Sequence, residues 1–206
     1  MTRLNKVLVT FIIGIFSVTA NASLIFTSDQ IAFNDAIVVG ASDDFESLGL
    51  GPGGILGLGN NVNRSDFTYS APTGLVGLGS GIGGLTSVGL ASDVFVDALT
   101  IDISGGHNVF GFEYTSTDSG TLNISIFDTL DNLIGFTSVA TAGTMSFIGM
   151  MSDIAIGRVL LDDGGIPGPI IDNVVAGTTL VPEPSILALL TIGFIGLASV
   201  RFKKKS

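Results

Sequence analysis

The chain of 206 residues contains no cysteine, no tryptophan and a single histidine. Without cysteine it can form no disulfide, no thiolate metal site and no thiol nucleophile. One histidine is also too few for a histidine-rich zinc site. A serine hydrolase triad would have to use His107, yet no serine lies in a nucleophile-elbow sequence. We therefore expect His107 to be an exposed side chain in the turn that Gly105 and Gly106 begin.

Basic residues are scarce in the middle of the chain. Of the 8 Lys and Arg, only Arg64 and Arg158 lie between residues 23 and 180, whereas 17 of the 18 Asp and Glu lie there. Two positive charges against 17 negative ones give this part a formal charge of −15. Such a surface repels phosphate backbones, which excludes nucleic-acid binding. An acidic surface suits a domain that meets divalent cations outside the cytoplasm. It is equally consistent with acidic residues that only keep the domain soluble.

Signatures of enzymes are also missing. The sequence has no phosphate-binding loop, and its glycines lack the strand–turn–helix context of a dinucleotide site. A pair of carboxylates can hydrolyse glycosidic bonds, but nothing in the spacing of the 17 acids singles out two of them. We expect a protein that is not an enzyme, and a carboxylate-dependent glycan hydrolase is the open alternative.

Residues 1–22 have the three parts of a secretory signal peptide. A basic start is followed by an apolar run over residues 7–18, which is too short to span a bilayer as a permanent anchor. Ala20 and Ala22 place small side chains at positions −3 and −1 of a cleavage site. We expect the export translocase to carry the chain across the membrane and signal peptidase to cut it before Ser23.

The C-terminus consists of Val181, Pro182, Glu183 and Pro184, an apolar run over residues 185–200, and a basic tail. Two prolines so close together cannot lie inside a regular helix, so they separate the domain from the run. A 16-residue helix is about 24 Å long, which is short for a hydrocarbon core of about 30 Å. The basic tail consists of Arg201, Lys203, Lys204 and Lys205. These charges would hold that end in the cytoplasm and leave the domain outside.

These three elements, in this order over residues 181–206, closely resemble the PEP-CTERM sorting signal. The resemblance implies that an exosortase, an integral-membrane cysteine transpeptidase, recognises the Pro182-Glu183-Pro184 triplet. It also implies export across the inner membrane of a Gram-negative bacterium that makes exopolysaccharide. The protein would be anchored in the membrane transiently and end at the cell surface or in the extracellular matrix. The alternative is an ordinary tail anchor with a proline-rich hinge.

Residues 23–180 are long enough for one domain. Residues 23–27 predict a short strand, after which Ser28 is a helix N-cap and a brief helix runs to Ala36. A further strand is predicted near Phe45. The segment 49–89 contains 13 glycines, which predict turns, bulges or a long irregular surface loop. A self-associating surface segment is the alternative for this stretch.

From residue 98 onward, apolar and polar residues alternate with period two, which predicts strands with one buried face. The predicted strands cover residues 99–103, 110–114, 122–126, 133–138, 145–150, 154–161 and 170–175. The predicted turns contain Gly105-Gly106, Ser119-Gly120 and Asp131-Asn132. About eight strands at these spacings indicate an all-β protein, an antiparallel β-sandwich of the jelly-roll kind.

Two short acidic segments resemble a pattern found in jelly-roll carbohydrate-binding modules. They are Asp44-Phe45-Glu46 near the start of the domain and Ile171-Asp172-Asn173-Val174 near its end. In those modules an acid that follows the Phe of an early strand and an Asp of the last strand share a structural calcium ion. The resemblance implies Glu46 and Asp172 as Ca²⁺ ligands and Asp44 as a third. The alternative is that these acids are solvated residues at strand ends.

Three functions remain open at this point. The first is a non-catalytic surface or matrix component that associates with exopolysaccharide or with other copies of itself. The second is a calcium-stabilised carbohydrate-binding module. The absence of tryptophan and the presence of only two tyrosines argue against strong sugar stacking. The third is the glycan hydrolase described above.

The signal peptide generates the first testable prediction. The mature chain is expected to begin at Ser23, because Ala20 and Ala22 combine small side chains with the right distance from the apolar run. Ala22→Phe should leave the uncut precursor in the inner membrane. Mass spectrometry of the N-terminal peptide from exported protein measures both outcomes, and an exported chain that keeps Met1 would contradict the prediction.

Overall fold

The computed structural model describes residues 23–93, 97–117, 119–162 and 169–180. The expected signal peptide at 1–22, the sorting motif at 181–184 and the expected membrane helix at 185–200 lie outside the described residues. Within the described ranges, no helix is long and apolar enough to cross a membrane.

The described residues form twelve strands, one short α-helix and one 3-10 turn, and every strand pairing is antiparallel. In chain order they are β1 (Leu24–Thr27), α2 (Gln30–Asp35), β2 (Ile37–Asp43), η1 (Glu46–Leu48), β3 (Ile55–Arg64), β4 (Phe67–Leu78), β5 (Gly89–Ser92), β6 (Leu99–Ile103), β7 (Val109–Thr115), β8 (Ser119–Asp128), β9 (Leu133–Ala142), β10 (Ser146–Ser152), β11 (Ile156–Asp162) and β12 (Ile170–Thr179).

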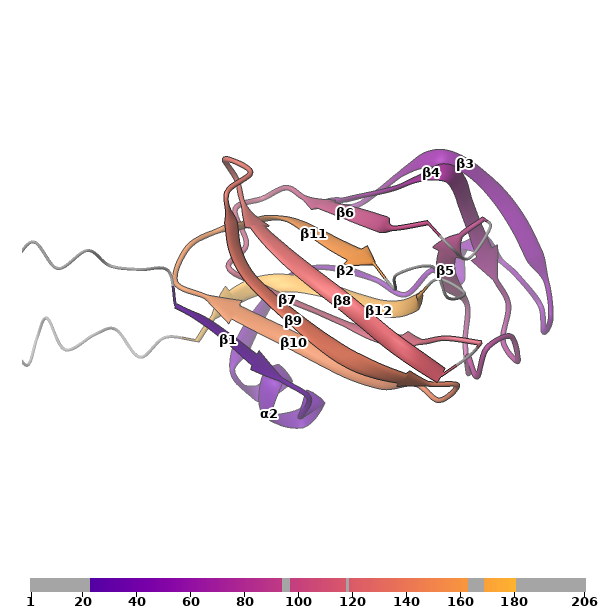
Figure 1. The fold of residues 1–206 in the computed structure, drawn as a ribbon, viewed down its shortest axis with the longest axis horizontal. Coiled ribbons are helices and arrows are strands. Elements are labelled where there is room, and N and C mark those ends of the chain that lie inside the picture. The colour runs from indigo at the N-terminus through magenta and orange to yellow at the C-terminus, as the bar shows by residue number, and fades with distance from the viewer. Residues whose placement is uncertain (1–22, 94–96, 118, 163–168, 181–206) are drawn as a thin grey trace, which may run out of the picture.

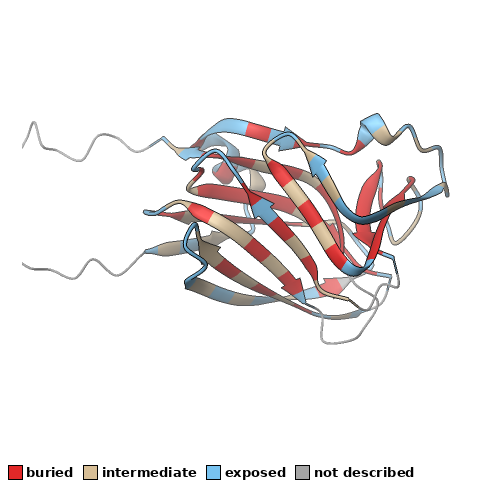
Figure 2. Cartoon of the chain, turned by 90° about the horizontal axis from the view of Figure 1, so that it is seen from above, coloured by how far each residue is buried: buried red, intermediate tan, exposed pale blue. Residues whose placement is uncertain are grey.

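The strands follow the order β1-β10-β7-β12-β5-β4-β6-β11-β8-β9, with β2 added to β12 and β3 added to β4. The long strand β4 pairs with β6 through its first half and with β5 through its second half, so it connects the two halves of this path. The path folds into two layers whose facing sides are buried (Figures 1 and 2). The predicted antiparallel jelly-roll β-sandwich is confirmed.

The period-two pattern places the core as the sequence predicts. The alternating apolar residues of β6 and β8 are almost all fully buried, whereas their polar neighbours are not. The seven strands predicted from residue 98 onward correspond to β6 to β12. Figure 2 shows the same alternation of buried and less buried residues along the strands. The core therefore results from one apolar face per strand, which two layers enclose.

The outer face of the β10–β7–β12 layer is covered by α2. Phe33 of this helix is fully buried, and its ring occupies the space over Gly111 and Gly149. A Cβ atom at Gly149 would lie 2.3 Å from the Phe33 ring, so only glycine allows this contact. The helix is capped by Asp29, whose Oδ1 accepts from Ala32 N at 3.0 Å. The predicted cap, Ser28, is therefore wrong by one residue.

For the glycine-rich segment, the prediction of a long irregular loop is wrong. The segment contains the long hairpin of β3 and β4 and the short strand β5. The ladder between β3 and β4 shifts register on both sides of Gly59, which has a φ of 80°. Glycine therefore permits bulges within this hairpin instead of preventing strands.

Three further predictions are corrected. Phe45 does not lie in a strand, because β2 ends at Asp43 and Phe45 has a φ of 56°. Ser119 and Gly120 do not form a turn, since they begin β8 and pair with β9. His107 is not exposed: its side chain is buried, and its Nε2 lies 3.0 Å from Asp66 Oδ2.

Candidate functional site

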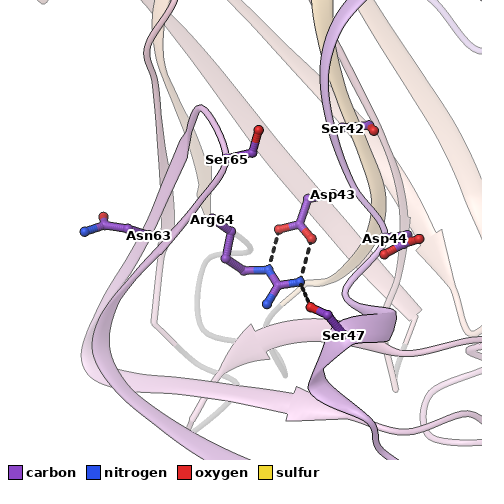
Figure 3. Close-up of a pocket in the computed structure, with 7 residues that line it drawn as sticks. All are labelled: Ser42, Asp43, Asp44, Ser47, Asn63, Arg64 and Ser65. Carbon is purple, nitrogen blue, oxygen red and sulfur yellow. Dashed lines mark hydrogen bonds and ion pairs between the residues drawn. The ribbon is translucent and has the colours of Figure 1, made fainter.

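A polar hollow of about 450 Å³ lies where the end of β2, η1 and the β3–β4 hairpin meet. Its lining residues all carry polar side chains; they are Ser42, Asp43, Asp44, Ser47, Asn63, Arg64 and Ser65. We call it the Arg64 pocket. Figure 3 shows the Asp43 and Arg64 side chains pointing toward each other, with Ser47 beside them, whereas Asn63 points away. Hydrogen-bond donors and acceptors therefore meet in one concave surface.

Arg64 is held in a fixed orientation by a two-point ion pair. Its Nε donates to Asp43 Oδ2 at 2.7 Å and its Nη2 donates to Asp43 Oδ1 at 2.9 Å. Nη2 also donates to Ser47 Oγ at 2.7 Å, and the guanidinium lies 5.4 Å from the centre of the Phe45 ring. The hydrogen bond to Asp43 raises the pKa of Arg64. Such a fork-to-carboxylate pair, stacked on a ring, loses little freedom when a ligand binds.

The turn after Asp43 holds Phe45 in an unfavourable backbone conformation, and burial of the Phe45 ring offsets the cost. Asp43 Oδ1 accepts from Phe45 N at 3.1 Å, which places Phe45 in the left-handed region. A bulky residue rarely adopts this conformation. The fully buried Phe45 ring packs at 5.4 Å against Tyr69, beneath the ion pair. Burial of the Tyr69 hydroxyl and the nearby Asp43 carboxylate raise the pKa of Tyr69 far above its ordinary value.

A second polar group lies around Asp172, which is completely buried in β12. Its carboxylate accepts from the Ser87 hydroxyl and from Asn173 N. Burial first, and then the negative charges of Glu113 and Glu46, raise the pKa of Asp172 to about 6, although the hydrogen bonds from Ser87 and Asn173 act to lower it. Asn173 has a φ of 47°, and the β12–β7 ladder shifts register just after Asp172. This bulge leaves a buried acid next to two others.

The structure brings together two of the three acids that the calcium pattern implied. Glu46 Oε1 accepts from Val88 N at 3.0 Å, directly beside the Ser87 that binds Asp172. Asp44 does not join them, because its Oδ1 accepts from Glu46 N and its side chain lines the Arg64 pocket. In the described ranges, no group of three or more His, Asp or Glu side chains is arranged to hold a metal ion. The expected three-carboxylate site is therefore not formed.

The residues around Asp172 nevertheless offer hard oxygen donors. Glu46 and Asp172 supply carboxylates and Ser87 a hydroxyl, which are the donor types that Ca²⁺ prefers. A cation there would offset both the burial and the nearby negative charges that raise the pKa of Asp172. The donor set fits calcium in kind, while the number of protein ligands is below the usual six to eight.

Sequence reasoning missed Asp43, Arg64 and Glu113. Arg64 did carry a signal, because it is one of only two basic residues between 23 and 180. Glu113 accepts from Gln30 Nε2 and Asn173 Nδ2, at 2.9 and 3.0 Å. These partners are 60 or more positions away in the chain, so no local pattern could have revealed them.

Residues 180–204 match the family model of the PEP-CTERM protein-sorting motif. This confirms the resemblance seen in the sequence. The motif indicates an exported protein that an exosortase processes, that is anchored transiently in the membrane and that is sorted to the cell surface. No curated protein matches the chain.

Several solved structures are similar to this chain in part. A family 29 carbohydrate-binding module is 14% identical, with a TM-score of 0.35, over 61% of this chain and 94% of the module. A family 6 carbohydrate-binding module is 14% identical, with a TM-score of 0.35, over 60% and 92%. The CBM22-1 and GH10 modules of a Clostridium thermocellum xylanase 10B, complexed with xylohexaose, are 17% identical with a TM-score of 0.35, over 68% and 28%. Likeness at this level carries no argument about function.

The buried Asp172 generates a prediction about pH. In the unfolded chain this acid ionises near its ordinary pKa of 3.8, whereas in the folded domain its pKa is about 6. Its contribution to stability is therefore greatest below pH 3.8 and is lost as the pH rises to 6. With a chelator present at pH 7.5, Asp172→Asn should raise the free energy of unfolding by about 2 kcal/mol. The difference should vanish near pH 4, where wild-type Asp172 is protonated when folded.

Denaturant unfolding of wild type and variant from pH 4 to 8 measures this effect. The control is Asp102→Asn, which removes one charge at an exposed position of strand β6. A stability difference for Asp172→Asn that stays constant across this pH range would contradict the prediction.

Proposed function

We propose that this chain is a non-catalytic component of the bacterial surface or extracellular matrix that associates with exopolysaccharide through the Arg64 pocket. The sorting motif supports the location, because it directs an exported chain to the cell surface. The observation that carries the binding role is the polar hollow around the Asp43–Arg64 pair. Its volume of about 450 Å³ lies in the range of sites that hold small ligands.

The lining matches the chemistry of sugar hydroxyls, which both donate and accept hydrogen bonds. Serine hydroxyls can do both, the Asp44 carboxylate accepts, and the guanidinium donates. None of the lining side chains is aromatic, so affinity per sugar would be modest and would depend on many repeats along the polymer. The domain charge of −15 would disfavour an anionic polymer. We therefore expect neutral or amino-bearing sugar units.

The geometry of Asp43 supports a non-catalytic role. Glycoside hydrolysis needs one carboxyl group free to donate a proton and a second one free to act as a base or nucleophile. Both oxygens of Asp43 already accept hydrogen bonds, two from Arg64 and one from Phe45 N. With both of its oxygens engaged, Asp43 is free for neither role.

Binding of the mature chain to exopolysaccharide from its own host tests this proposal. The double variant Ser42→Ala, Ser65→Ala should raise the dissociation constant about tenfold, because two hydrogen bonds together contribute about 1.5 kcal/mol or more to binding. The control Thr121→Ala, Thr129→Ala removes two exposed hydroxyls of β8 and the loop that follows it, and should bind like wild type. Calorimetry or co-sedimentation gives the constants. Equal affinity of all three proteins, or no binding by wild type, would reject the pocket as the sugar site.

A second candidate is a calcium-stabilised carbohydrate-binding module. The observation in its favour is that Glu46 and Asp172 meet at Ser87 and Val88, next to Glu113. By the earlier resemblance, Glu46 and Asp172 would hold the ion and Ser87 would add a hydroxyl. The ion would fix the start of β12 to η1 and to the segment before β5. It would support the fold and take no part in sugar chemistry.

Thermal unfolding of the mature chain tests the calcium site. Calcium at 100 times its dissociation constant should stabilise the folded domain by about 2.7 kcal/mol and raise the melting temperature by several degrees. Magnesium should help less, and sodium chloride of equal ionic strength less still, because it only screens charge. Glu46→Gln and Asp172→Asn should each lose most of the calcium response. The site is absent if sodium matches calcium or if both variants respond like wild type.

A further inference from the structure

Both ends of the described chain lie at the same end of the sandwich (Figure 1). Ser23 N donates to Asp153 Oδ1 at 2.9 Å, and Asp153 N donates back to Ser23 O at 3.2 Å. Asn108 joins the last residues of β10 and β12. Its Nδ2 donates to Ser152 O at 2.8 Å, and its Oδ1 accepts from Thr179 N at 3.3 Å. The chain therefore enters and leaves the fold at one fixed place.

The fold ends where the sorting motif begins. Leu180 N still donates to Ala36 O at 2.8 Å, and the motif match starts at residue 180. Only residues 181–184 separate Leu180 from the apolar run 185–200. Four residues reach at most about 14 Å, and each headgroup layer of a bilayer is itself about 5–8 Å thick. While the chain is anchored, this end of the sandwich therefore stays within about 14 Å of the start of the apolar run.

The same end carries large apolar side chains that the fold does not cover. Each is more than half exposed; they are Ile25, Val38, Val39 and Leu180, and we call them the terminal face. A largely apolar hollow of about 350 Å³ lies beside them. It is lined by Ser23, Ile25, Asn108, Met151, Ser152, Asp153 and Thr179. Val38 pairs with Thr178, two residues before Leu180, and Ile25 lines the same hollow as Thr179, so the four residues gather at one end of the sandwich. Exposed apolar groups gathered in this way indicate a contact surface.

Val38 and Val39 are successive residues of β2, so their side chains point to opposite faces of the sheet. The ladder with β12 pairs Val39 with Gly177 and Ala41 with Ala176, so a bulge falls between them. In the described chain, β2 pairs with β12 alone, which makes it an edge strand. Exposed valines on an edge strand promote pairing with other chains unless something covers them.

Two occupants could cover this surface, a second copy of the chain or the bilayer. A second copy brings another domain of charge −15, and like charges resist such a contact. The short tether, in contrast, already holds the surface at the lipid. We propose that the terminal face contacts the bilayer surface while the sorting tail anchors the chain, and that Ile25, Val38, Val39 and Leu180 insert among the lipid headgroups. Because Asp153 lies at this end, the contact favours zwitterionic over anionic lipid.

The absence of cysteine allows a direct test on the full-length chain without its signal peptide. The chain is placed in phosphatidylcholine nanodiscs, and single cysteines are labelled with a fluorophore after Ile25→Cys, Val39→Cys or Ile55→Cys. Ile55 is the control, because it is 65% exposed and belongs to β3, the strand that Figure 1 draws on the side of the molecule away from both chain ends. Lipid that carries a nitroxide near the headgroup should quench positions 25 and 39 at least threefold more than position 55. Anionic lipid should reduce that difference.

A pair of charge variants separates lipid contact from proximity that the tether alone imposes. With the label at position 25, Val38→Asp, Val39→Asp should at least halve the quenching. Ile55→Asp, Leu56→Asp adds the same charge at exposed apolar positions of β3 and should leave the quenching unchanged. Equal quenching at all three labelled positions, or an equal effect of both charge variants, overturns the proposal. Quenching by nitroxide-labelled copies of the chain in place of lipid would identify a second copy as the occupant and overturn it too.

Discussion

A continuous row of aromatic rings between the two layers is the interaction on which the rest of the structure depends. Successive ring centres lie 5.4 to 6.2 Å apart, in tilted or edge-on contacts. The row runs through Phe45, Tyr69, Phe67, Phe110, Phe112 and Tyr114. Each such contact adds about 0.5–1.5 kcal/mol to the burial of its rings. Because the row joins β4 in one layer to β7 in the other, it fixes the layers relative to each other. Its first ring holds the turn of the Arg64 pocket, and its last, Tyr114, pairs with Ile171 beside the buried Asp172.

The charge distribution distinguishes the Arg64 pocket, which contains an ion pair, from the acids around Asp172, which have no basic partner in the described part of the chain. Both arginines of the domain are already engaged. Arg64 binds Asp43, and Arg158 Nη2 lies 2.6 Å from Asp131 Oδ1 with its guanidinium 4.3 Å from the Phe127 ring. No lysine or third arginine exists between residues 23 and 180 to neutralise Asp172, Glu46 and Glu113. Amides and hydroxyls hold those acids instead, and the hydrogen bonds to Asp172 lower its pKa by less than burial raises it.

The predictability of each feature from sequence depends on how local its cause is. The strands from β6 onward follow from alternation, because burial of one face is encoded in neighbouring residues. The sorting motif is likewise local, and its recognition was confirmed. The β3–β4 hairpin was missed because glycine content suggests loops, although glycine at position 59 serves a bulge. Phe45 and His107 were misplaced because distant partners, Tyr69 and Asp66, determine where they lie. The Arg64–Asp43 pair joins residues 21 positions apart, and no spacing rule in the sequence encodes it.

The arrangement of these features along β2 relates sorting to binding. Ile37, at the start of β2, pairs with Thr179 next to the sorting motif, whereas Asp43, at its end, lies in the Arg64 pocket. Six residue steps along a strand span about 20 Å. The pocket is therefore separated from the tethered end by the length of one strand. In the arrangement proposed above, the pocket stays accessible to a polymer while the terminal face lies against lipid. The strained turn at Phe45 is stabilised by the core and not by the chain end, so the geometry of the Arg64 pocket does not depend on the sorting tail.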